Sequence, residues 1–423
     1  MRPLTHSDVQ PVSTAPASSG LSLSSAADAN PRWIAKDTPD FKRASWALFL
    51  AGFASFSLIY CVQPLLPAFR GTYGVNAATA SLALSLTTGT LAFAILASGA
   101  YSQSIGRRGV MFVSMLLAAG FNFVAAVVPG WHWLLAARAC EGLVLGGVPA
   151  VAMAYLAEEI DPRHLGKAMG LYVGGTAFGA MVGRVGMGIV SAHASWQAAM
   201  QILGVVCLLA AVGFVLLLPP SRNFQARKIP LQAHLQLWKG HLKNPALVRL
   251  YAIGAMLTSV FTTVFNYATF RLTDAPFGLD TTAVSMIFLT YALGMVSSAY
   301  GGQLADRFGR KVMLSTGFSV VLVGVLLTLP DQLGWVIAGI SLITIGFFIG
   351  HAAASGAVGA NAGNAKSHAS SLYLLFYYIG ASVTGSLGGW FWIHGGWTAV
   401  AGLTAAAALT GLVLSLSFSR TEV

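Results

Sequence analysis

The sequence predicts an all-α membrane protein with twelve membrane-spanning helices. Only 9% of its 423 residues are charged and 56% are hydrophobic, whereas a soluble globular protein carries roughly 25% charged residues. Apolar runs of about 20 residues, the helix length that crosses a bilayer, recur along the chain. The sequence lacks the short alternating segments of a transmembrane barrel. Helices are therefore the spanning element, because they pair every backbone polar group internally.

The apolar runs divide the chain into four parts. Residues 1–42 are rich in Ser, Ala and Pro and predict a disordered cytoplasmic tail. Two halves of six spans each, residues 43–218 and 247–420, flank a cytoplasmic linker at 219–246. The predicted spans of the first half are 44–68, 78–102, 109–129, 132–157, 165–191 and 195–218. Those of the second half are 247–270, 281–304, 312–329, 333–359, 368–392 and 397–418.

The distribution of Lys and Arg predicts the orientation. Of the 24 Lys and Arg residues, all but four lie on the tails, the linker and the loops on the same side as the termini. Arg70 and Arg271 lie on the other side, and Arg138 and Arg184 lie within spans. Since cytoplasmic segments are enriched in these residues, both termini are expected in the cytoplasm. The net charge of +11 is then a signal of topology and not of nucleic-acid binding. Linker residues 222–243 predict a short amphipathic helix on the membrane surface.

The two halves repeat each other at an offset of about 200 residues, which indicates a duplicated transporter architecture. The matching segments are YGVNAATAS (73–81) with FGLDTTAVS (277–285), SIGRRGVMF (104–112) with RFGRKVMLS (307–315), and KAMGLYVGGTAFGAMV (167–182) with HASSLYLLFYYIGASV (368–383).

On these features the chain resembles the major facilitator superfamily. GGQLADRFGRK (301–311) matches the family's loop motif between the second and third spans of each half. YCVQPLLP (60–67) and RACEGLVLGG (138–147) resemble first-span and fourth-span segments of the bacterial drug:proton antiporter branch. GTAFGAMVGR (175–184) lies where that branch usually has Gly-Pro in span five, and Ala180 replaces the Pro. The resemblance implies a secondary transporter of the inner membrane that works by alternating access.

The loop motif predicts a latch at the cytoplasmic ends of the spans. Asp306 is expected to pair with Arg310 and to face the N-terminus of span eleven near Lys366, which favours the outward-open state. The alternative is a plain positive-inside anchor. The glycines predict tight turns in either case. The residues assigned to gating are Gly99, Gln103, Gly106, Arg107, Arg108, Gly302, Asp306, Arg307, Gly309, Arg310 and Lys311.

Three charged residues fall deep within predicted spans, where a charge costs at least about 2.5–3.5 kcal/mol. Arg138 and Glu141 are three residues apart and share one face of span four, and Arg184 is expected at a similar depth in span five. In one interpretation Glu141 carries a proton beside Arg138, and an arginine attracts an anionic or carbonyl-bearing substrate. In the other, Glu141 is permanently ionised and neutralises the arginines. His351 is a second candidate proton carrier, since histidine titrates near neutral pH, or a packing residue.

The resemblance implies that the first span of each three-helix unit lines a central cavity. Span eleven adds further aromatic residues, including Phe376 and Tyr378. Such a cavity suits small amphipathic compounds, although each aromatic is equally suited to helix packing. Pro64 and Pro67 predict a kink in span one. The predicted substrate-binding residues are Tyr60, Gln63, Arg138, Arg184, Asn266, Tyr267, His351, Tyr373 and Tyr377.

The favoured function is proton-coupled efflux of small organic compounds by a monomer in the lipid bilayer. Uptake of a sugar or an organic anion is the first alternative, and a non-transporting membrane sensor is the second. The sequence has no phosphate-binding Gly loop, no paired-histidine metal motif and no nucleophile with an obvious base, so it predicts neither an enzyme nor a cofactor or metal site. Cys61, Cys140 and Cys207 lie in apolar runs and are expected to be free.

The first-half copy of the loop motif has Gln103 where the second has Asp306, so its latch is expected to be weaker. Gln103→Asp should restore the charge and raise the outward-open population, because a carboxylate interacts more strongly than an amide with a helix N-terminus. Spin-label distances between the cytoplasmic ends of the halves measure this population. An unchanged distance distribution would remove the latch interpretation.

Overall fold

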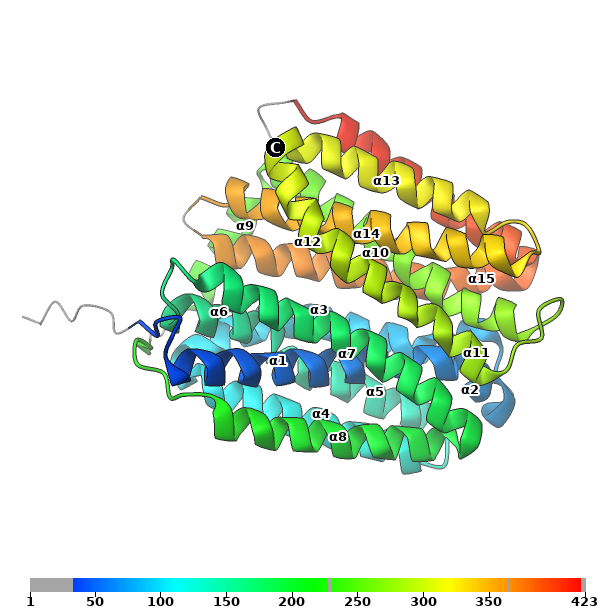
Figure 1. The fold of residues 1–423 in the computed structure, drawn as a ribbon, viewed down its shortest axis with the longest axis horizontal. Coiled ribbons are helices and arrows are strands. Elements are labelled where there is room, and N and C mark those ends of the chain that lie inside the picture. Colours follow the sequence, from blue (N-terminus) through cyan, green and yellow to red (C-terminus); the bar gives the residue numbers. More distant parts are fainter. Residues whose placement is uncertain (1–32, 227–229, 364, 420–423) are drawn as a thin grey trace, which may run out of the picture. The chain divides into compact units, whose positions relative to one another are not determined.

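The computed structural model describes residues 33–226, 230–363 and 365–419, except for the side chains at Gly302 and Asp306. Figure 1 shows that helices make up both halves. The first half contains α1 (Pro39–Tyr60), η1 (Gln63–Leu65), α2 (Leu66–Tyr73), α3 (Ala77–Ile105), α4 (Arg107–Val127), α5 (Trp131–Leu145), α6 (Pro149–Glu159), α7 (Leu165–His193) and α8 (Trp196–Leu217). The linker contains α9 (Leu231–Leu242). The second half contains α10 (Pro245–Thr273), α11 (Thr281–Ser285), η2 (Met286–Thr290), α12 (Tyr291–Phe308), α13 (Arg310–Leu327), α14 (Leu333–Asn361) and α15 (Lys366–Leu416).

The predicted twelve-span fold is confirmed. Within the described residues, 11 helical stretches are long and apolar enough to cross a membrane. The last of them, α15, has 51 residues and joins two predicted spans at Gly395 and Gly396, whose backbone angles are not helical. Gly396 has φ +57°, a conformation that glycine adopts without steric cost. The chain therefore turns between its last two spans at these two glycines.

Three predicted spans are interrupted helices. Span one breaks after Tyr60 into η1 and α2, with Pro64 and Pro67 at the starts of these two elements, which confirms the predicted kink. Span four divides into α5 and α6 at Gly146–Val148. Span eight begins as the short helix α11, continues through η2 and becomes α12. These breaks leave backbone carbonyls without helical partners inside the bundle.

The two copies of the loop motif form the expected tight turns. Gly106 precedes α4 with φ +114°, and Gly309 precedes α13 with φ +88°. Both values lie in the region that favours glycine over other residues. The motif glycines thus connect consecutive spans through a single residue in each half.

The predicted tail extends too far, because the chain is already ordered before residue 42. Ile34 is buried and forms a bridge with Ile160, and its backbone N–H donates to the carbonyl of Glu159 at 2.8 Å. The Thr38 side chain caps the start of α1 by accepting from the backbone N–H of Phe41. Capping by threonine just before a proline is a helix-start signal that the predicted boundary missed. Residues 1–32 of the predicted tail lie outside the described residues.

The linker contains the helix predicted for residues 222–243. Its His234 is buried and approaches His368 of α15 with 2.9 Å between Nδ1 and Nε2. Trp238 donates from Nε1 to the hydroxyl of Ser371 at 3.3 Å. These contacts attach α9 to the beginning of α15.

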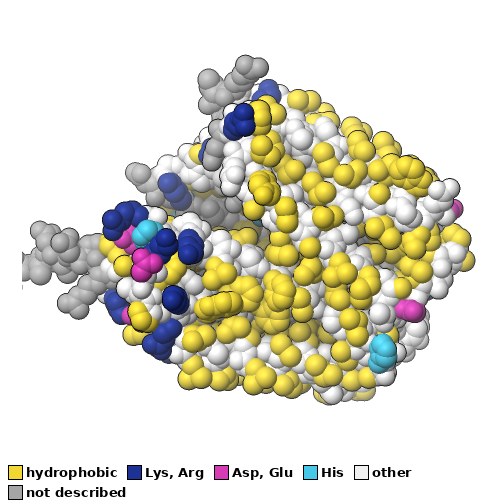
Figure 2. All heavy atoms as spheres, viewed as in Figure 1, with side chains coloured by type: hydrophobic (Ala, Val, Ile, Leu, Met, Phe, Trp, Pro, Cys, Tyr) yellow, Lys and Arg dark blue, Asp and Glu magenta, His cyan; other side chains and the backbone are white. Residues whose placement is uncertain are grey.

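Charge and hydrophobicity are segregated along the helices. Figure 2 shows hydrophobic side chains across the middle of one face and Lys and Arg side chains gathered toward the left. This end, here called the terminal end, carries α9 and the beginning of α1, whereas the distal end carries α2 and α11 (Figure 1). Such a band of exposed apolar side chains suits lipid contact.

Close helix contacts depend on glycines in α7. An added Cβ at Gly175 would lie 2.4 Å from the Phe49 carbonyl oxygen, and one at Gly179 would lie 2.2 Å from that of Phe53. Small residues let transmembrane helices approach this closely. The hydroxyl of Ser57 donates to the Gly179 carbonyl at 2.8 Å, so α1 and α7 are also joined by a hydrogen bond.

Gly179→Ala should therefore destabilise the protein by about 1–3 kcal/mol, the usual range for overpacking. Gly186→Ala is the matched control on the same helix, because no heavy atom lies within 4 Å of the added Cβ. The control should be neutral or stabilising by up to about 1 kcal/mol, since alanine favours helix more than glycine does. Melting temperatures in detergent test this, and equal values for the two variants would contradict it.

Candidate functional site

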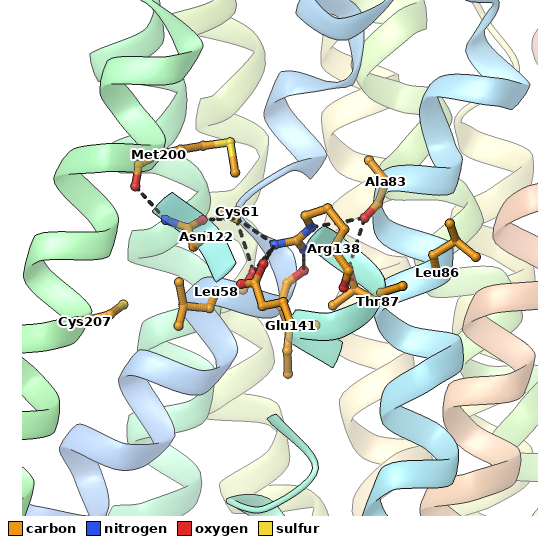
Figure 3. Close-up of polar contacts among 12 residues, drawn as sticks. Leu58, Cys61, Ala83, Leu86, Thr87, Asn122, Arg138, Glu141, Met200 and Cys207 are labelled. Carbon is orange, nitrogen blue, oxygen red and sulfur yellow. Dashed lines mark hydrogen bonds and ion pairs between the residues drawn. The ribbon is translucent and has the colours of Figure 1, made fainter. Parts of the chain in front are cut away.

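Arg138 and Glu141 form a buried ion pair on α5. Both residues are 0% exposed, and Arg138 Nη1 lies 2.6 Å from Glu141 Oε2. The guanidinium also donates to the carbonyls of Leu58 at 3.1 Å and Ile59 at 2.8 Å in α1, and to that of Ala83 at 3.2 Å in α3 (Figure 3). Leu58 and Ile59 belong to the last turn of α1, so the break in span one supplies these acceptors.

All of these partners belong to the first half. The predicted proximity of Arg138 and Glu141 is therefore present, with the pair linking α5 to α1 and α3. Glu141 Oε1 is buried and has no hydrogen-bond partner among the residues that the structure describes. A carboxylate with one bonded and one unbonded oxygen can accept a further donor or a proton.

Arg184, which was expected at a similar depth, bonds to other residues than Arg138 and Glu141 do. Its Nε donates to Gln63 Oε1 at 2.5 Å and its Nη1 donates to the Ala180 carbonyl at 2.7 Å. The guanidinium carbon lies 4.1 Å from the ring centre of Tyr60 and 4.6 Å from that of Tyr291. Tyr291 belongs to the second half, so Arg184 lies at the contact between the halves.

Polar contacts join the two halves toward the distal end. Gln63 Nε2 donates to Asn266 Oδ1 at 2.8 Å, and both side chains are buried. Closer to the loops, Arg70 and Asp274 form a bidentate ion pair with distances of 2.8 and 2.5 Å. The hydroxyl of Ser382 in α15 donates to a carbonyl in α3 at 2.6 Å. These contacts hold the distal ends of the halves together.

A cavity of about 160 Å³ lies between the halves. An engineered cavity of about 150 Å³ holds benzene, so this one can accommodate a single ring. Aromatic side chains dominate its wall, and no Asp or Glu occurs among its described lining residues. The wall is formed by Phe56, Tyr60, Pro149, Met153, Tyr172, Val173, Thr176, Ala177, Ala180, Phe261, Tyr291, Ser298, Phe347, Phe348, His351, Leu374, Tyr377 and Tyr378.

His351 supplies a polar group to this wall. Its Nδ1 lies 2.9 Å from the hydroxyl of Tyr373, and its ring stacks on Phe347 at 5.8 Å between centres. The structure thus places His351 where a bound compound could reach it, with Tyr373 fixing the ring. Tyr377, also predicted for the binding site, lines the cavity.

A larger vestibule of about 980 Å³ opens toward the terminal end. Residues from both halves line it, including Gln103 of α3 and Lys366 of α15. Met153 and Leu374 line both the vestibule and the central cavity, so the two spaces adjoin. The cavity is therefore accessible from the terminal end and covered at the distal end.

Part of the predicted gating motif lies at this vestibule. Arg107 lines it and pairs with Glu158 of α6 at 2.5 Å. Arg108 donates to the Val215 carbonyl, and Lys311 donates to that of Phe418. These bonds connect the loop motif of each half to the last span of the same half.

For the other residues assigned to gating, the structure gives no contact between the halves that would test the assignment. The guanidinium of Arg307 lies 5.2 Å from the ring centre of Phe308, its neighbour in sequence. Gly99 lies near the end of α3, and Arg310 begins α13. Gly302 and Asp306 have side chains outside the described residues, so the latch with Arg310 and span eleven stays a prediction.

An ion pair in the loop before α7 also lies at the terminal end. Arg163 donates to the Asp161 carboxylate from its side chain, at 2.7 Å from Nη2, and from its backbone N–H at 2.9 Å. These hydrogen bonds lower the pKa of Asp161 to about 2. Asp161 therefore stays ionised at any physiological pH, so it neither takes up nor releases a proton in that range.

The structure divides the predicted binding residues into four groups. Tyr60, His351 and Tyr377 line the cavity, and Tyr373 supports His351. Tyr267 lies elsewhere, with its hydroxyl donating to the Gly385 carbonyl at 2.8 Å. Gln63, Asn266 and Arg184 form the polar contact between the halves, and Arg138 bonds only within the first half.

Sequence reasoning missed Tyr172 and Tyr291, which also line the cavity. The internal repeat contained a signal for the first of them. In the matched segments KAMGLYVGG and HASSLYLLF, Tyr172 occupies the position of Tyr373, which was predicted. Extending the prediction from one copy of the repeat to the other would have found it.

The protein has two helical halves and, between them, a cavity for a single ring that is open at one end. This is the architecture of a membrane carrier. The sequence profile of the Major Facilitator Superfamily matches residues 48–383 and 273–423. The chain belongs to this superfamily, which confirms the predicted family, and it is a multi-pass membrane transporter.

Related proteins agree with this assignment. The chain is 42% identical over 388 residues to the MFS-type transporter YybF of Bacillus subtilis, covering 92% of this chain and 96% of YybF. It is 37% identical over 389 residues to the inner membrane transport protein YnfM of Escherichia coli, covering 92% and 93%. The crystal structure of the human organic anion transporter MFSD10 matches with a TM-score of 0.70 at 16% identity, covering 88% and 99%, and so shares the fold.

Asp274→Asn should weaken closure at the distal end, because it removes the charge from the ion pair with Arg70 that joins the halves. Both side chains are about a third exposed, so the pair contributes on the order of 0.2–1 kcal/mol, a shift of up to about fivefold between states. Distances between spin labels on the loops after α2 and α10 measure the opening. Asp331→Asn, which weakens the Arg271 pair within the second half, is the control and should leave the distances unchanged. Equal behaviour of the two variants would contradict the assigned role.

Proposed function

We propose that this transporter is a secondary active carrier that exports small organic compounds in exchange for protons by alternating access. The observation that carries the proposal is the central cavity between the halves, which the vestibule reaches from one end and polar contacts cover at the other. Separation of Arg70 from Asp274, together with closure of the vestibule, would expose the same cavity to the opposite side. The described cavity wall draws on both halves of one chain, so the proposed transport by a monomer needs no residue from a second copy.

The Lys and Arg distribution supports the orientation in the membrane that the proposal uses. If the terminal end faces the cytoplasm, as the positive-inside rule favours, the structure is an inward-open state. A compound from the cytoplasm then reaches the aromatic cavity through the vestibule. The similarity to YnfM, an inner membrane protein, supports the same membrane for this chain.

Glu141 is the proposed proton carrier, with Arg138 as its partner. A buried carboxylate whose second oxygen has no donor is poorly stabilised in its charged form. Protonation of Glu141 would weaken the pair and loosen the contacts of Arg138 with α1 and α3. His351 offers a second proton site in direct contact with the cavity.

Uptake of an organic anion is the second candidate. It is favoured by the absence of Asp and Glu from the described cavity wall and by the positive charge of Arg184 beside Tyr60. Both candidates use the same cavity and differ in the direction of proton movement relative to the substrate. A sensor that binds a ligand without moving it would not need a cavity that is open at one end and closed at the other.

Proteoliposomes under an imposed pH gradient separate these functions. Exchange predicts that vesicles with an acidic interior accumulate substrate, whereas symport predicts accumulation from an acidic exterior. A panel of neutral and acidic small organic compounds, followed by mass spectrometry, identifies the transported ones. Absence of gradient-driven accumulation in both directions would contradict secondary active transport.

Glu141→Gln should abolish gradient-driven accumulation while leaving substrate counterflow. The variant is expected to fold, because Arg138 keeps three backbone carbonyl acceptors. Asp331→Asn is a matched control, since it also removes a carboxylate from a buried arginine, Arg271. Retained coupling in Glu141→Gln, at normal folding, would exclude Glu141 as the proton carrier.

A further inference from the structure

Arg184 is a buried arginine whose charge no carboxylate in the described part of the chain neutralises. It is 1% exposed, and its hydrogen-bond acceptors are the neutral oxygens of Gln63 and Ala180. In the described part of the chain, each other arginine that is at least nine-tenths buried pairs with a carboxylate: Arg107 with Glu158, Arg138 with Glu141, and Arg271 with Asp331. Arg184 therefore departs from the way this protein accommodates buried cations.

The rings of Tyr60 and Tyr291 partly compensate for the missing carboxylate. They lie 4.1 and 4.6 Å from the guanidinium carbon, within the range of a cation–π interaction. Such contacts stabilise the cation but leave its net charge in place. The surroundings of Arg184 thus remain positive and suited to an anion, and a guanidinium binds carboxylates with two parallel hydrogen bonds.

This charge lies directly behind the wall of the central cavity. Tyr60 and Tyr291 both line the cavity, and so does Ala180, whose carbonyl accepts from Arg184 Nη1. The cavity volume of about 160 Å³ fits one ring, and its described wall is aromatic and free of carboxylates. The cavity therefore suits an apolar ring, and the neighbouring Arg184 suits a negative charge attached to that ring.

We propose that the substrate is a small organic acid, with its ring in the aromatic cavity and its carboxylate on Arg184. The inference rests on the proposed transport function and specifies the substrate class. The carboxylate reaches the guanidinium between Tyr60 and Tyr291. It supplies the charge partner that Arg184 lacks, and the aromatic wall removes the ring from water.

Binding at this position also acts on the contact between the halves through Gln63. Its Oε1 accepts from Arg184 Nε at 2.5 Å, while its Nε2 donates to Asn266 Oδ1 at 2.8 Å. A substrate carboxylate that takes over Arg184 Nε releases Gln63 from one of its two partners. The remaining bond to Asn266 no longer fixes the side chain from both ends, so an acid loosens a contact that covers the distal side of the cavity.

The test measures binding to the full-length purified protein by thermal stabilisation and titration. The probes are two matched pairs with a single ring, benzoate with benzamide and 4-methylbenzoate with 4-methylbenzamide, which differ in charge and hardly in shape. The acids should bind about tenfold or more tightly than their amides, as expected for a charge-assisted contact. Arg184→Gln should remove this preference, and Arg184→Lys should retain part of it. Arg163→Gln, a lost charge on an exposed side chain, should leave it intact.

Gln63→Glu keeps the proposal testable even where changes at Arg184 prevent folding. An internal carboxylate at this position would pair with Arg184, raise the melting temperature without ligand and block the response to acids. Equal binding of acids and amides, no binding of either acid, or an unchanged acid preference in Gln63→Glu would each overturn the proposal. Gradient-driven transport of neutral compounds alone would overturn it while leaving the proposed transport function in place.

Discussion

The structure depends on the requirement that a charge within a membrane bundle must find partners inside the protein. Arg138 meets it with Glu141 and three backbone carbonyls, and all of these groups come from the first half. Two of the carbonyls are available because span one breaks after Tyr60. The kink, the ion pair and the packing of α1, α3 and α5 are therefore one connected feature.

The contact between the halves follows a different principle, because it must form and break. Its members are amides, hydroxyls and the partly exposed pair of Arg70 and Asp274, each bond being of modest strength. The fully buried ion pair of Arg138 and Glu141 lies within one half and is more costly to disrupt. This division keeps each half intact while the halves can move relative to each other.

Much of the fold could be predicted from sequence because the relevant signals are local. Run length defined the spans, glycines marked the turns at 106 and 309, and a spacing of three residues brought Arg138 and Glu141 together. The pairing of Arg70 with Asp274 was not predicted, although the two residues are 204 positions apart and occupy equivalent positions of the internal repeat. A repeat shows which positions correspond, and correspondence alone does not show which of them touch. Aromatic residues on a cavity wall have the same sequence pattern as those in a packed core. The sequence therefore does not separate Tyr291, which lines the cavity, from Tyr267, whose hydroxyl bonds to the Gly385 carbonyl.

The location of partners along the chain also sets an order of assembly during synthesis. Every hydrogen-bond partner of Arg138 precedes residue 142, so its charge can be satisfied before the second half emerges from the ribosome. Arg184 finds Gln63 and Tyr60 in the nascent chain but meets Tyr291 only later. The described partners of Arg138 are therefore all present once the first half has been synthesised, whereas the surroundings of Arg184 are completed by the second half.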